Sequence, residues 1–277
     1  MVHRVPVALS PSSLGSFTKC PLAFRFSYIE RLPEPPSAAA SKGTLVHLAL
    51  QHLMWRPAAE RTLAAALTDL DRARADLTDD PDLADLALTD AEWDAFHADA
   101  EALLRRYFEL EDPTTVRPIG LELRVQAEVA PGVRMRGVID RLELDGDGEL
   151  VITDYKTGKP PPPQRLQESL TGVNIYSRLC EAMLGRRPAR VQLLYLSAPE
   201  RIVSTPTPAT LRGVGNRAGA VMSAVRTACE RDDFRPKTSP LCNWCSFQEF
   251  CPAFGGDPEL ARPTLEARYA NGGAGVA

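Results

Sequence analysis

Two aspartates and a lysine lie at the ends of two neighbouring strand-like segments. Asp140 ends the run Gly137-Val-Ile-Asp140, and Asp154-Tyr-Lys156 begins fourteen positions after it. Two carboxylates this close repel each other unless a cation lies between them, and Mg²⁺ and Mn²⁺ prefer such oxygen ligands. The cation would polarise a phosphoryl oxygen, while the Lys156 ammonium would orient the attacking water or stabilise the developing negative charge. The three residues therefore predict a metal-dependent phosphodiesterase.

The two segments are predicted to pair as an antiparallel hairpin. The sequence between them, Asp145-Gly-Asp-Gly148, is a turn signal. Pairing Leu144 with Leu150 brings the apolar faces of both segments to the same side and places Asp140 opposite Asp154. A four-residue loop would give the wrong parity, so we expect a five-residue loop or a bulge. Opposed Cβ atoms lie about 4.5–5.5 Å apart, which is close enough for one divalent ion to bridge the two carboxylates.

The competing interpretation is an ordinary Asp–Lys pair at the edge of a sheet, with the Asp-Gly turn merely polar. A D-x-K triplet is short, and charged residues are common on protein surfaces. Lysine is rare in this chain, however, because only five of its 32 basic residues are Lys. A lysine two positions after an aspartate is therefore not expected by chance in this composition. The opposed Asp140 strengthens the metal-site interpretation.

A second group of residues that could bind a metal is formed by cysteines. Cys242-Asn-Trp-Cys245 and Cys251 supply three thiolates at a spacing typical of zinc and iron–sulfur sites. Cys20 is the candidate fourth ligand, and it would join the two ends of the chain as a clasp. Cys180 and Cys229 lie in helix-like stretches and are predicted to be buried apolar residues. Disulfides are the alternative, but no secretory leader is visible, so a cytoplasmic location with reduced cysteines is expected.

These motifs resemble those of the RecB-type branch of the PD-(D/E)XK nucleases, in the order of that family and over about residues 9 to 254. Gly43-Thr-Leu-Val-His47 is similar to its G-x-x-x-H motif, and the segment Gly137–Arg141 to its G-x-I-D-R motif. Asp154-Tyr-Lys156-Thr-Gly158 is similar to its D-x-K-T-G motif. The cysteine pattern resembles that of the iron–sulfur exonucleases of the branch, including the CRISPR-associated enzymes and the AddB nuclease domain.

The resemblance implies a role for each matching residue. Taken alone, His47 could equally be a packed helix histidine. The implied ligands of Mg²⁺ or Mn²⁺ are His47, Asp140, Asp154 and the carbonyl of Tyr155, and the implied catalytic residues are Asp140, Asp154, Lys156 and Tyr176. The implied ligands of a [4Fe–4S] cluster, with Zn²⁺ as the alternative, are Cys20, Cys242, Cys245 and Cys251.

One family motif is incomplete. Tyr176 matches the tyrosine of the Q-x-x-x-Y motif, but Gly172 stands at the glutamine position. Glu122 is a candidate acidic residue of the site, or else a glutamate on an exposed strand. Candidate substitutes for the missing glutamine, none of them at the family spacing, are Gln167, Glu168 and Asn174.

The elements that must position these residues form a mixed α/β core. The resemblance implies a central mixed sheet flanked by helices, as in restriction-endonuclease-like folds, within a single domain over residues 1–256. Residues 57–111 read as a helical insertion, and residues 257–277 as a flexible tail. Strands are expected near 119–130, 133–144, 149–156 and 191–196, and helices from near residue 10, from near residue 41, and near 164–184 and 207–231.

Composition limits how the chain could bind a polyanion. The formal charge of −4 and the pI near 5.7 argue against a generally basic surface. Phosphate contacts would then depend on local arginines, which can hold two phosphate oxygens at once. No apolar run is long enough to span a membrane. The candidate arginines, any of which could simply be solvated, are Arg25, Arg31, Arg141, Arg165 and Arg178.

Taken together, the sequence predicts a deoxyribonuclease that depends on Mg²⁺ or Mn²⁺. By resemblance, the preferred activity is exonucleolytic digestion of single-stranded DNA ends in DNA repair or processing. One alternative is a catalytically degenerate DNA-binding module, suggested by Gly172 in place of glutamine. Another is a scaffold protein whose cysteines bind structural zinc. The sequence does not identify its protein partners.

Overall fold

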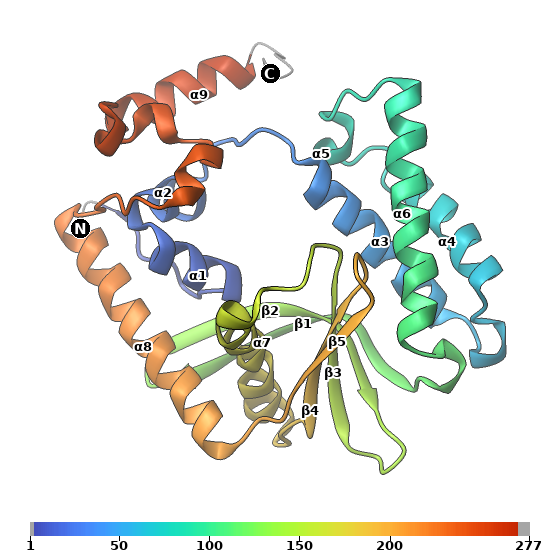
Figure 1. Cartoon of the computed structure of the whole chain (residues 1–277). Coiled ribbons are helices and arrows are strands. Elements are labelled where there is room, and N and C mark those ends of the chain that lie inside the picture. Colours follow the sequence, from blue (N-terminus) through green and yellow to red (C-terminus); the bar gives the residue numbers. More distant parts are fainter. Residues whose placement is uncertain (1–2, 271–277) are drawn as a thin grey trace. The chain divides into compact units, whose positions relative to one another are not determined.

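The computed structural model describes residues 3–270, apart from the side chains of residues 167, 168 and 270 (Figure 1). The chain divides into two compact units, where the sequence predicts one domain over residues 1–256. The terminal unit comprises Met1–Pro35, Gln126–Arg136 and Arg212–Ala277, and the central unit comprises Pro36–Val125 and Gly137–Leu211. No described helix has the length and apolar character needed to cross a bilayer.

The elements expected from the sequence are present, with boundaries shifted by a few residues. The sequence did not indicate the strand β5 or the helix α9. The helices are α1 (Pro11–Lys19), α2 (Pro21–Phe24), α3 (Ala38–Trp55), α4 (Leu63–Asp76), α5 (Pro81–Ala84), α6 (Asp90–Leu110), α7 (Pro163–Leu184), α8 (Pro208–Arg231) and α9 (Ala261–Ala270). The strands are β1 (Pro118–Ala130), β2 (Val133–Leu144), β3 (Leu150–Lys156), β4 (Arg190–Tyr195) and β5 (Glu200–Ser204).

The strands form one mixed sheet in the order β1-β2-β3-β4-β5. β3 is antiparallel to β2 and parallel to β4, and β4 is antiparallel to β5. A parallel neighbour requires a crossover connection, and α7 supplies it between β3 and β4. The predicted mixed sheet flanked by helices is therefore confirmed.

The register predicted for the β2–β3 hairpin is also confirmed. Leu144 pairs with Leu150, and the pairing continues to Arg141 and Thr153. Residues 145–149 lie between the strands, which is the five-residue loop that the parity argument requires. The backbone of Gly148 in this loop has a φ of 76°, a conformation that glycine adopts without strain.

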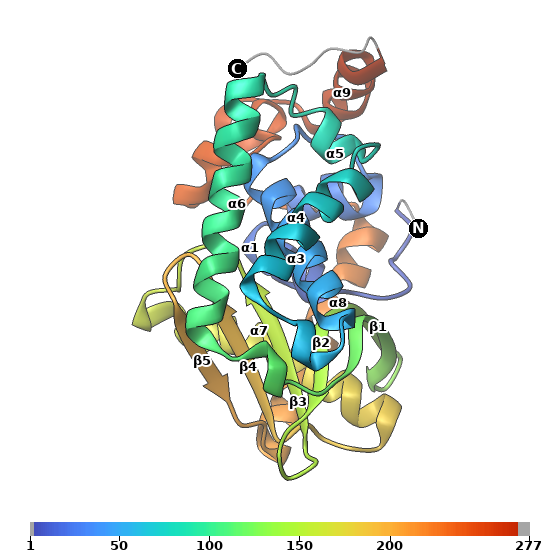
Figure 2. The ribbon, with the colours of Figure 1, turned by 90° about the vertical axis from the view of Figure 1, so that its right-hand side faces the viewer.

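Side chains of β3 are buried on both faces of the sheet. Tyr155 joins the hydrophobic core that α3, α4 and α6 form, whereas Asp154 points to the opposite face because strand side chains alternate. Figure 2 shows these three helices side by side. The last of them begins at a capping box in which the Glu92 side chain accepts a hydrogen bond from the backbone of Thr89. β3 therefore holds one face in an apolar core and leaves the other for polar residues.

A buried guanidinium organises the polar groups on the core-facing side of β2 and β3. Arg141 has no exposed surface, and its Nη2 donates to Glu111 Oε2 at 3.0 Å and to Thr153 Oγ1 at 3.1 Å. Its Nη1 donates to the Tyr155 hydroxyl at 2.7 Å, and its Nε lies 2.5 Å from Glu143 Oε2. Two carboxylates and two hydroxyl groups, contributed by β2, β3 and the C-cap of α6, thus share one cation. Arg141 is therefore not available for the phosphate contact that the sequence suggested.

The terminal unit has a core of its own, built from both ends of the chain. Leu9 forms a parallel bridge with Met135, and the ring of Phe26 packs against Phe247 with centroids 5.0 Å apart. The sequence predicts a flexible tail from residue 257, but α9 forms there and buries Leu265. The buried Leu265 side chain anchors this helix, which the composition of the segment does not reveal. Residues 271–277 of the predicted tail lie outside the described ones.

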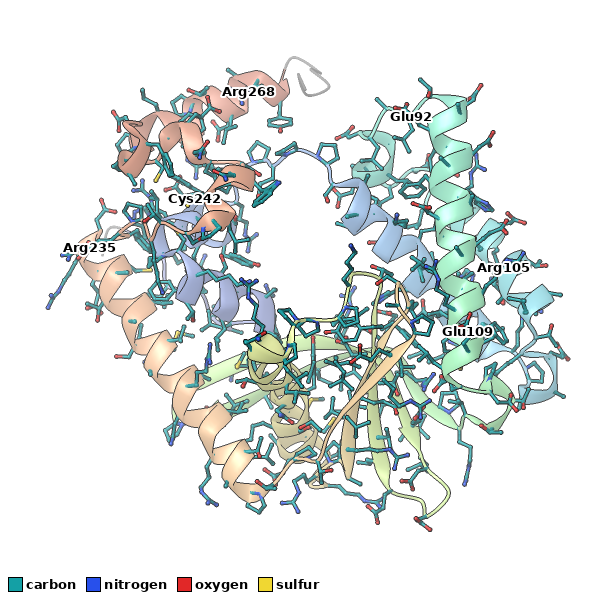
Figure 3. The ribbon with its side chains drawn as sticks, viewed as in Figure 1. Glu92, Arg105, Glu109, Arg235, Cys242 and Arg268 are labelled. Atoms are coloured by element: carbon teal, nitrogen blue, oxygen red, sulfur yellow. The ribbon has the colours of Figure 1, made fainter. Side chains whose placement is uncertain are left out.

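The Arg141 network predicts a large and specific loss of stability. Arg141→Met would remove the cation that the nearly buried Glu111 and Glu143 share, leaving Glu111 the longer Arg201 contact at 4.0 Å. Loss of one partner of a buried ion pair typically costs about 3–5 kcal/mol. Urea denaturation followed by circular dichroism would measure the free energy of unfolding. Arg105→Met is the matched control, because Arg105 is exposed on α6 (Figure 3) and, among residues 3–270, has its ion pair with Glu101 at 3.4 Å. That control should change stability by less than about 1 kcal/mol, and equal effects of the two substitutions would contradict the prediction.

Candidate functional site

The predicted aspartates and lysine come together at the β2–β3 hairpin of the central unit. The backbone N–H of Tyr155 donates to Asp140 Oδ2 at 2.7 Å, which holds this carboxylate against the end of β3. The Lys156 ammonium lies 2.6 Å from Asp154 Oδ2. Asp140 and Asp154 occupy the next positions of the pairing that runs from Leu144 to Arg141. The hairpin therefore places both acids and the ammonium on one face.

His47 reaches this group from α3. Its Nε2 lies 3.1 Å from the carbonyl oxygen of Tyr155, to which it can donate, and its Nδ1 lies 3.6 Å from Asp140 Oδ2. When Nε2 carries the proton, Nδ1 offers a lone pair toward the carboxylates. Gly43, one turn earlier, lies against Thr157, since a Cβ there would lie 3.4 Å from Thr157 Oγ1, the distance of an ordinary contact. The G-x-x-x-H and D-x-K-T-G segments thus contact each other in space.

Glu122 joins the site through an unusual backbone conformation. Its φ of 44° lies in the left-handed region, although it stands within β1. Its carboxylate Oε1 lies 3.9 Å from His47 Nδ1. Ligand atoms of Glu122, His47 and Asp140 all lie within 4.8 Å of one another, and among the described residues this is the group that could hold a metal ion. The sequence left Glu122 open between a site acid and an exposed strand residue.

Burial and mutual repulsion raise the pKa values of Asp140 and Glu122 in the absence of a cation. Burial, followed by repulsion from Asp154, raises the pKa of Asp140 to about 7, although His47 opposes the shift. Burial and Asp154 also raise the pKa of Glu122. Burial would lower the pKa of Lys156, but attraction to Asp154 raises it above its ordinary value. The donor set of two carboxylates and an imidazole therefore fits a divalent cation, which would relieve this repulsion.

The three-residue group omits two of the predicted ligands, Asp154 and the Tyr155 carbonyl, and their role as ligands stays a prediction. Asp154 is paired with Lys156 and is not a member of the three-residue group, although its charge acts on Asp140 and Glu122. The Tyr155 carbonyl, predicted as a ligand, accepts the hydrogen bond of His47. Sequence reasoning could find the acids by motif, but a single strained residue of β1 has no local pattern that identifies it.

Tyr176 of α7 packs over the hairpin. A Cβ on Gly137 would lie 2.6 Å from Tyr176 Cε1, so the glycine of the G-x-I-D-R segment provides the space for this ring. Burial, together with Asp154 and Asp140, raises the pKa of the Tyr176 hydroxyl. Among the substitutes for the missing glutamine, Asn174 donates to Ser204 Oγ at 3.2 Å. Gln167 and Glu168 lie outside the residues whose side chains are described.

The four predicted cluster cysteines belong to the terminal unit, although no three of their Sγ atoms lie within 4.8 Å of one another. Burial raises the pKa of Cys245, and the neighbouring thiols of Cys20, Cys242 and Cys251 raise it further. The backbone N–H of Ser239 donates to Cys242 Sγ at 3.3 Å. Figure 3 shows Cys242 in the segment that follows α8. Cys180 and Cys229 are buried, as the sequence predicts.

Three of the arginines suggested for phosphate contacts are paired. Besides Arg141, Arg25 is buried and binds Glu30 and Glu259. Arg178 Nη1 donates to Glu181 Oε2 at 2.7 Å. Arg31 and Arg165 are exposed. Neighbouring carboxylates, which composition does not reveal, decide which arginines remain available.

The chain matches the PD-(D/E)XK nuclease superfamily over residues 8–252. Since this match covers most of the 277 residues, the chain belongs to that superfamily. Membership supports a nuclease activity, and divalent metals are typical of these enzymes. The acidic group around His47 is a possible site for one.

The fold is shared with a solved structure. A crystal structure described as "Putative exonuclease" from Eubacterium rectale has a TM-score of 0.57 and 12% identity, covering 86% of this chain and 87% of that chain. A structure described as "SSO0001" has a TM-score of 0.35 and 15% identity, covering 76% of this chain and 84% of that chain. The search of curated proteins gives no match. At these identities the first likeness concerns the fold alone.

The raised pKa of Asp140 predicts how stability depends on pH without metal. An unfolded aspartate has a pKa of about 3.9, so the folded protein holds this proton more tightly. Stability should therefore fall as pH rises from about 4 through about 7. Asp140→Asn should remove this component and, in EDTA at pH 8, raise stability by on the order of 2 kcal/mol. Denaturation at several pH values would measure it.

The control for this measurement is Asp147→Asn, which changes an exposed aspartate in the loop between the same two strands. It should leave the pH profile of the wild type in place. At pH 8, Mn²⁺ should raise the stability of the wild-type protein much more than it raises the stability of the Asp140→Asn variant. Identical pH profiles for Asp140→Asn and the wild type would contradict the prediction.

Proposed function

We propose that this nuclease is a deoxyribonuclease that depends on Mg²⁺ or Mn²⁺ and digests single-stranded DNA from its ends. The observation that carries the proposal is the convergence of His47, Glu122 and Asp140 beside the Asp154–Lys156 pair, on the hairpin of a PD-(D/E)XK nuclease. What supports the end-directed activity is a solved structure of the same fold that is described as "Putative exonuclease". Such an enzyme would act in DNA repair or processing.

The residues that would hold the metal are His47, Glu122 and Asp140, with Asp154 as an additional carboxylate. A bound divalent cation would supply Lewis-acid polarisation of a phosphoryl oxygen. The protein fixes its ligands beforehand: Tyr155 N–H holds Asp140, and the Tyr155 carbonyl holds His47. The backbone N–H and the carbonyl of a single residue of β3 therefore orient two of the proposed ligands.

Lys156 is the proposed catalytic lysine. Its ammonium is held at the end of β3 by Asp154 and remains 42% exposed along its side chain, so it can reach a substrate. There it would stabilise negative charge on the phosphoryl group or orient the attacking water. The Tyr176 hydroxyl, kept protonated by its surroundings, can donate a hydrogen bond at the same site. Neither role requires the glutamine that Gly172 replaces.

The cysteines are proposed to hold a [4Fe–4S] cluster through Cys20, Cys242, Cys245 and Cys251. What supports this proposal is that the thiols of Cys20, Cys242 and Cys251 act on Cys245, and that Cys242 accepts a backbone hydrogen bond, as cluster thiolates do. The cluster would join the segment before α2 to the segment after α8. Its role would be structural, since none of its ligands belongs to the central unit that carries the acids.

Lys156→Ala and Asp154→Asn should each reduce metal-dependent cleavage by about 10²-fold or more, because each removes a group that acts on the reacting phosphate. The assay follows end-labelled single-stranded and duplex oligonucleotides with and without Mn²⁺. Lys159→Ala, which changes an exposed lysine of the same segment, is the control and should cleave as the wild type does. Shortening from one end would identify an exonuclease.

Equal cleavage by Lys156→Ala and the wild type would refute the catalytic assignment. DNA binding without any release of nucleotides in Mn²⁺ would instead favour the degenerate DNA-binding module. Gly172 suggests this second candidate, because it stands where the family has a glutamine. A Cβ there would contact nothing within 4 Å, so packing does not require a glycine at this position.

The cluster proposal predicts a brown protein when it is purified without oxygen. Cys20→Ser should lose the broad visible absorbance of cysteine-ligated iron and the associated iron and sulfide. Cys180→Ser, which changes a buried cysteine of the central unit, should keep both. A colourless protein that contains stoichiometric zinc would contradict the iron–sulfur assignment and support the structural zinc site.

A further inference from the structure

The terminal unit contains a cleft that the proposed chemistry does not use. Its volume is about 570 Å³, within the range of about 300–1,000 Å³ typical of ligand sites. Its walls come from three parts of the unit: residues 4–10, the turn around Tyr28 to Arg31, and the strand positions Gln126 and Arg136. All of them belong to one compact unit. The cleft is therefore a feature of that unit alone.

The charged side chains that line the cleft are all cationic. Arg4, Arg31 and Arg136 are exposed there, and none of the lining residues is an aspartate or glutamate. Within residues 3–270 these three guanidinium groups have no ion pair or side-chain hydrogen bond, unlike the paired Arg25 nearby in the sequence. Basic residues also outnumber acidic ones in the terminal unit, whereas the central unit is acidic. Such a cleft attracts a polyanion.

An aromatic ring stands in the same cleft. Tyr28 stacks on the buried ring of Phe24, with centroids 5.4 Å apart and an interplanar angle of 20°. Phe17 in turn packs edge-on against Phe24 at 5.2 Å. The Tyr28 ring is thus backed by a rigid aromatic layer. Such rings form platforms on which successive bases of a single strand stack.

The backbone beside the cleft is strained at Arg31, one of the three cationic residues that line it. Arg25–Glu30 form a π-helical turn, a rare element that is frequent at functional sites. Arg31, which follows it, has a φ of 55°, a left-handed conformation that favours glycine. Strain of this kind persists where a side chain is needed at that place. The N-terminus of α1 also faces the cleft through Ser10 and has no acidic residue in its first turn, which favours an anion.

We propose that this cleft binds a single-stranded segment of the nucleic-acid substrate. Arg4, Arg31 and Arg136 would contact successive phosphates, and a base would stack on Tyr28. The assignment of nucleic acid as the polyanion rests on the proposed function. An acidic peptide would pair with the guanidinium groups, but it has no base to stack on the Tyr28 ring, which Phe24 supports from behind. Single strands, unlike duplexes, expose base faces for stacking.

The test measures binding separately from cleavage. Fluorescence anisotropy of a labelled oligothymidylate of about 12 nucleotides, in EDTA to prevent metal-dependent cutting, gives the Kd of the full chain at several salt concentrations. The logarithm of the binding constant falls with the logarithm of salt by about 0.7 for each phosphate contact to a single strand. The slope therefore counts the contacts that each variant loses.

The double variant Arg31→Gln/Arg136→Gln should reduce the salt slope by about 1.4 and weaken binding at low salt by about tenfold or more. Tyr28→Leu should weaken binding by about fivefold or more without changing the slope, because stacking is not ionic. Arg217→Gln changes an exposed arginine of α8 in the same unit that does not line the cleft. It should leave both the slope and the affinity close to the wild type. Thermal melting would verify that each variant is folded.

Several outcomes would overturn the proposal. One is a double variant that is folded and binds with the wild-type slope. Another is a duplex that binds as tightly as the single strand and is equally sensitive to Tyr28→Leu. A third is an oligoglutamate of equal charge that binds as tightly and depends on the same residues. Lys156→Ala should bind DNA as tightly as the wild type, so loss of cleavage in that variant would not count against the proposed binding cleft. If the wild-type protein binds DNA through the cleft but does not cleave it, only the proposed function would be refuted.

Discussion

The architecture of the candidate site depends on a cation that the solvent does not reach. Arg141 binds Glu111, Glu143, Thr153 and Tyr155 on the core-facing side of the β2–β3 hairpin. Side chains alternate along a strand, so fixing residues 141 and 155 on one side directs residues 140, 154 and 156 to the other. A slip of one residue would expose the guanidinium network and bury the acids in an apolar core. The same interaction therefore specifies the register and aims the candidate ligands.

The two faces of the hairpin carry buried charge in different ways. On the core side, the Arg141 guanidinium is shared by Glu111 and Glu143, and burial still raises the pKa of Glu143. On the site side, Asp140 and Glu122 hold protons more strongly than usual because they lack a cation of their own. Lys156 forms its ion pair with Asp154. The site face thus carries more acids than cations where a divalent ion and a phosphate would meet, which is where a nuclease needs electrostatic potential.

Local patterns in the sequence were sufficient to predict the hairpin and its loop. Leu144 and Leu150 define the register through parity alone, and the Asp-Gly turn marks the reversal. The motif order also led to the superfamily that the comparison supports. These inferences succeeded because each depends on neighbours along the chain or on a motif whose spacing is fixed by one strand or one helix.

What the sequence did not reveal depends on contacts between distant segments. The pairing of Arg141 with Glu111 and of Arg25 with Glu259 joins residues far apart in the chain, so neither could be distinguished from a solvated arginine. β5 has an exposed and irregular pattern, and α9 is held by few buried side chains. The division into two units arises because the tip of the β1–β2 hairpin belongs with the two chain ends.

The left-handed backbone of Glu122 has a consequence for how this protein could change over time. A glycine would adopt its φ of 44° freely, whereas a residue with a Cβ loses about 1–2 kcal/mol there. Replacement by glycine would thus relax the backbone and, in the same step, remove a carboxylate from His47 and Asp140. Selection for activity and selection for stability oppose each other at this one position. A lineage released from the need to cleave would be expected to lose the acid here early, while its fold grew more robust.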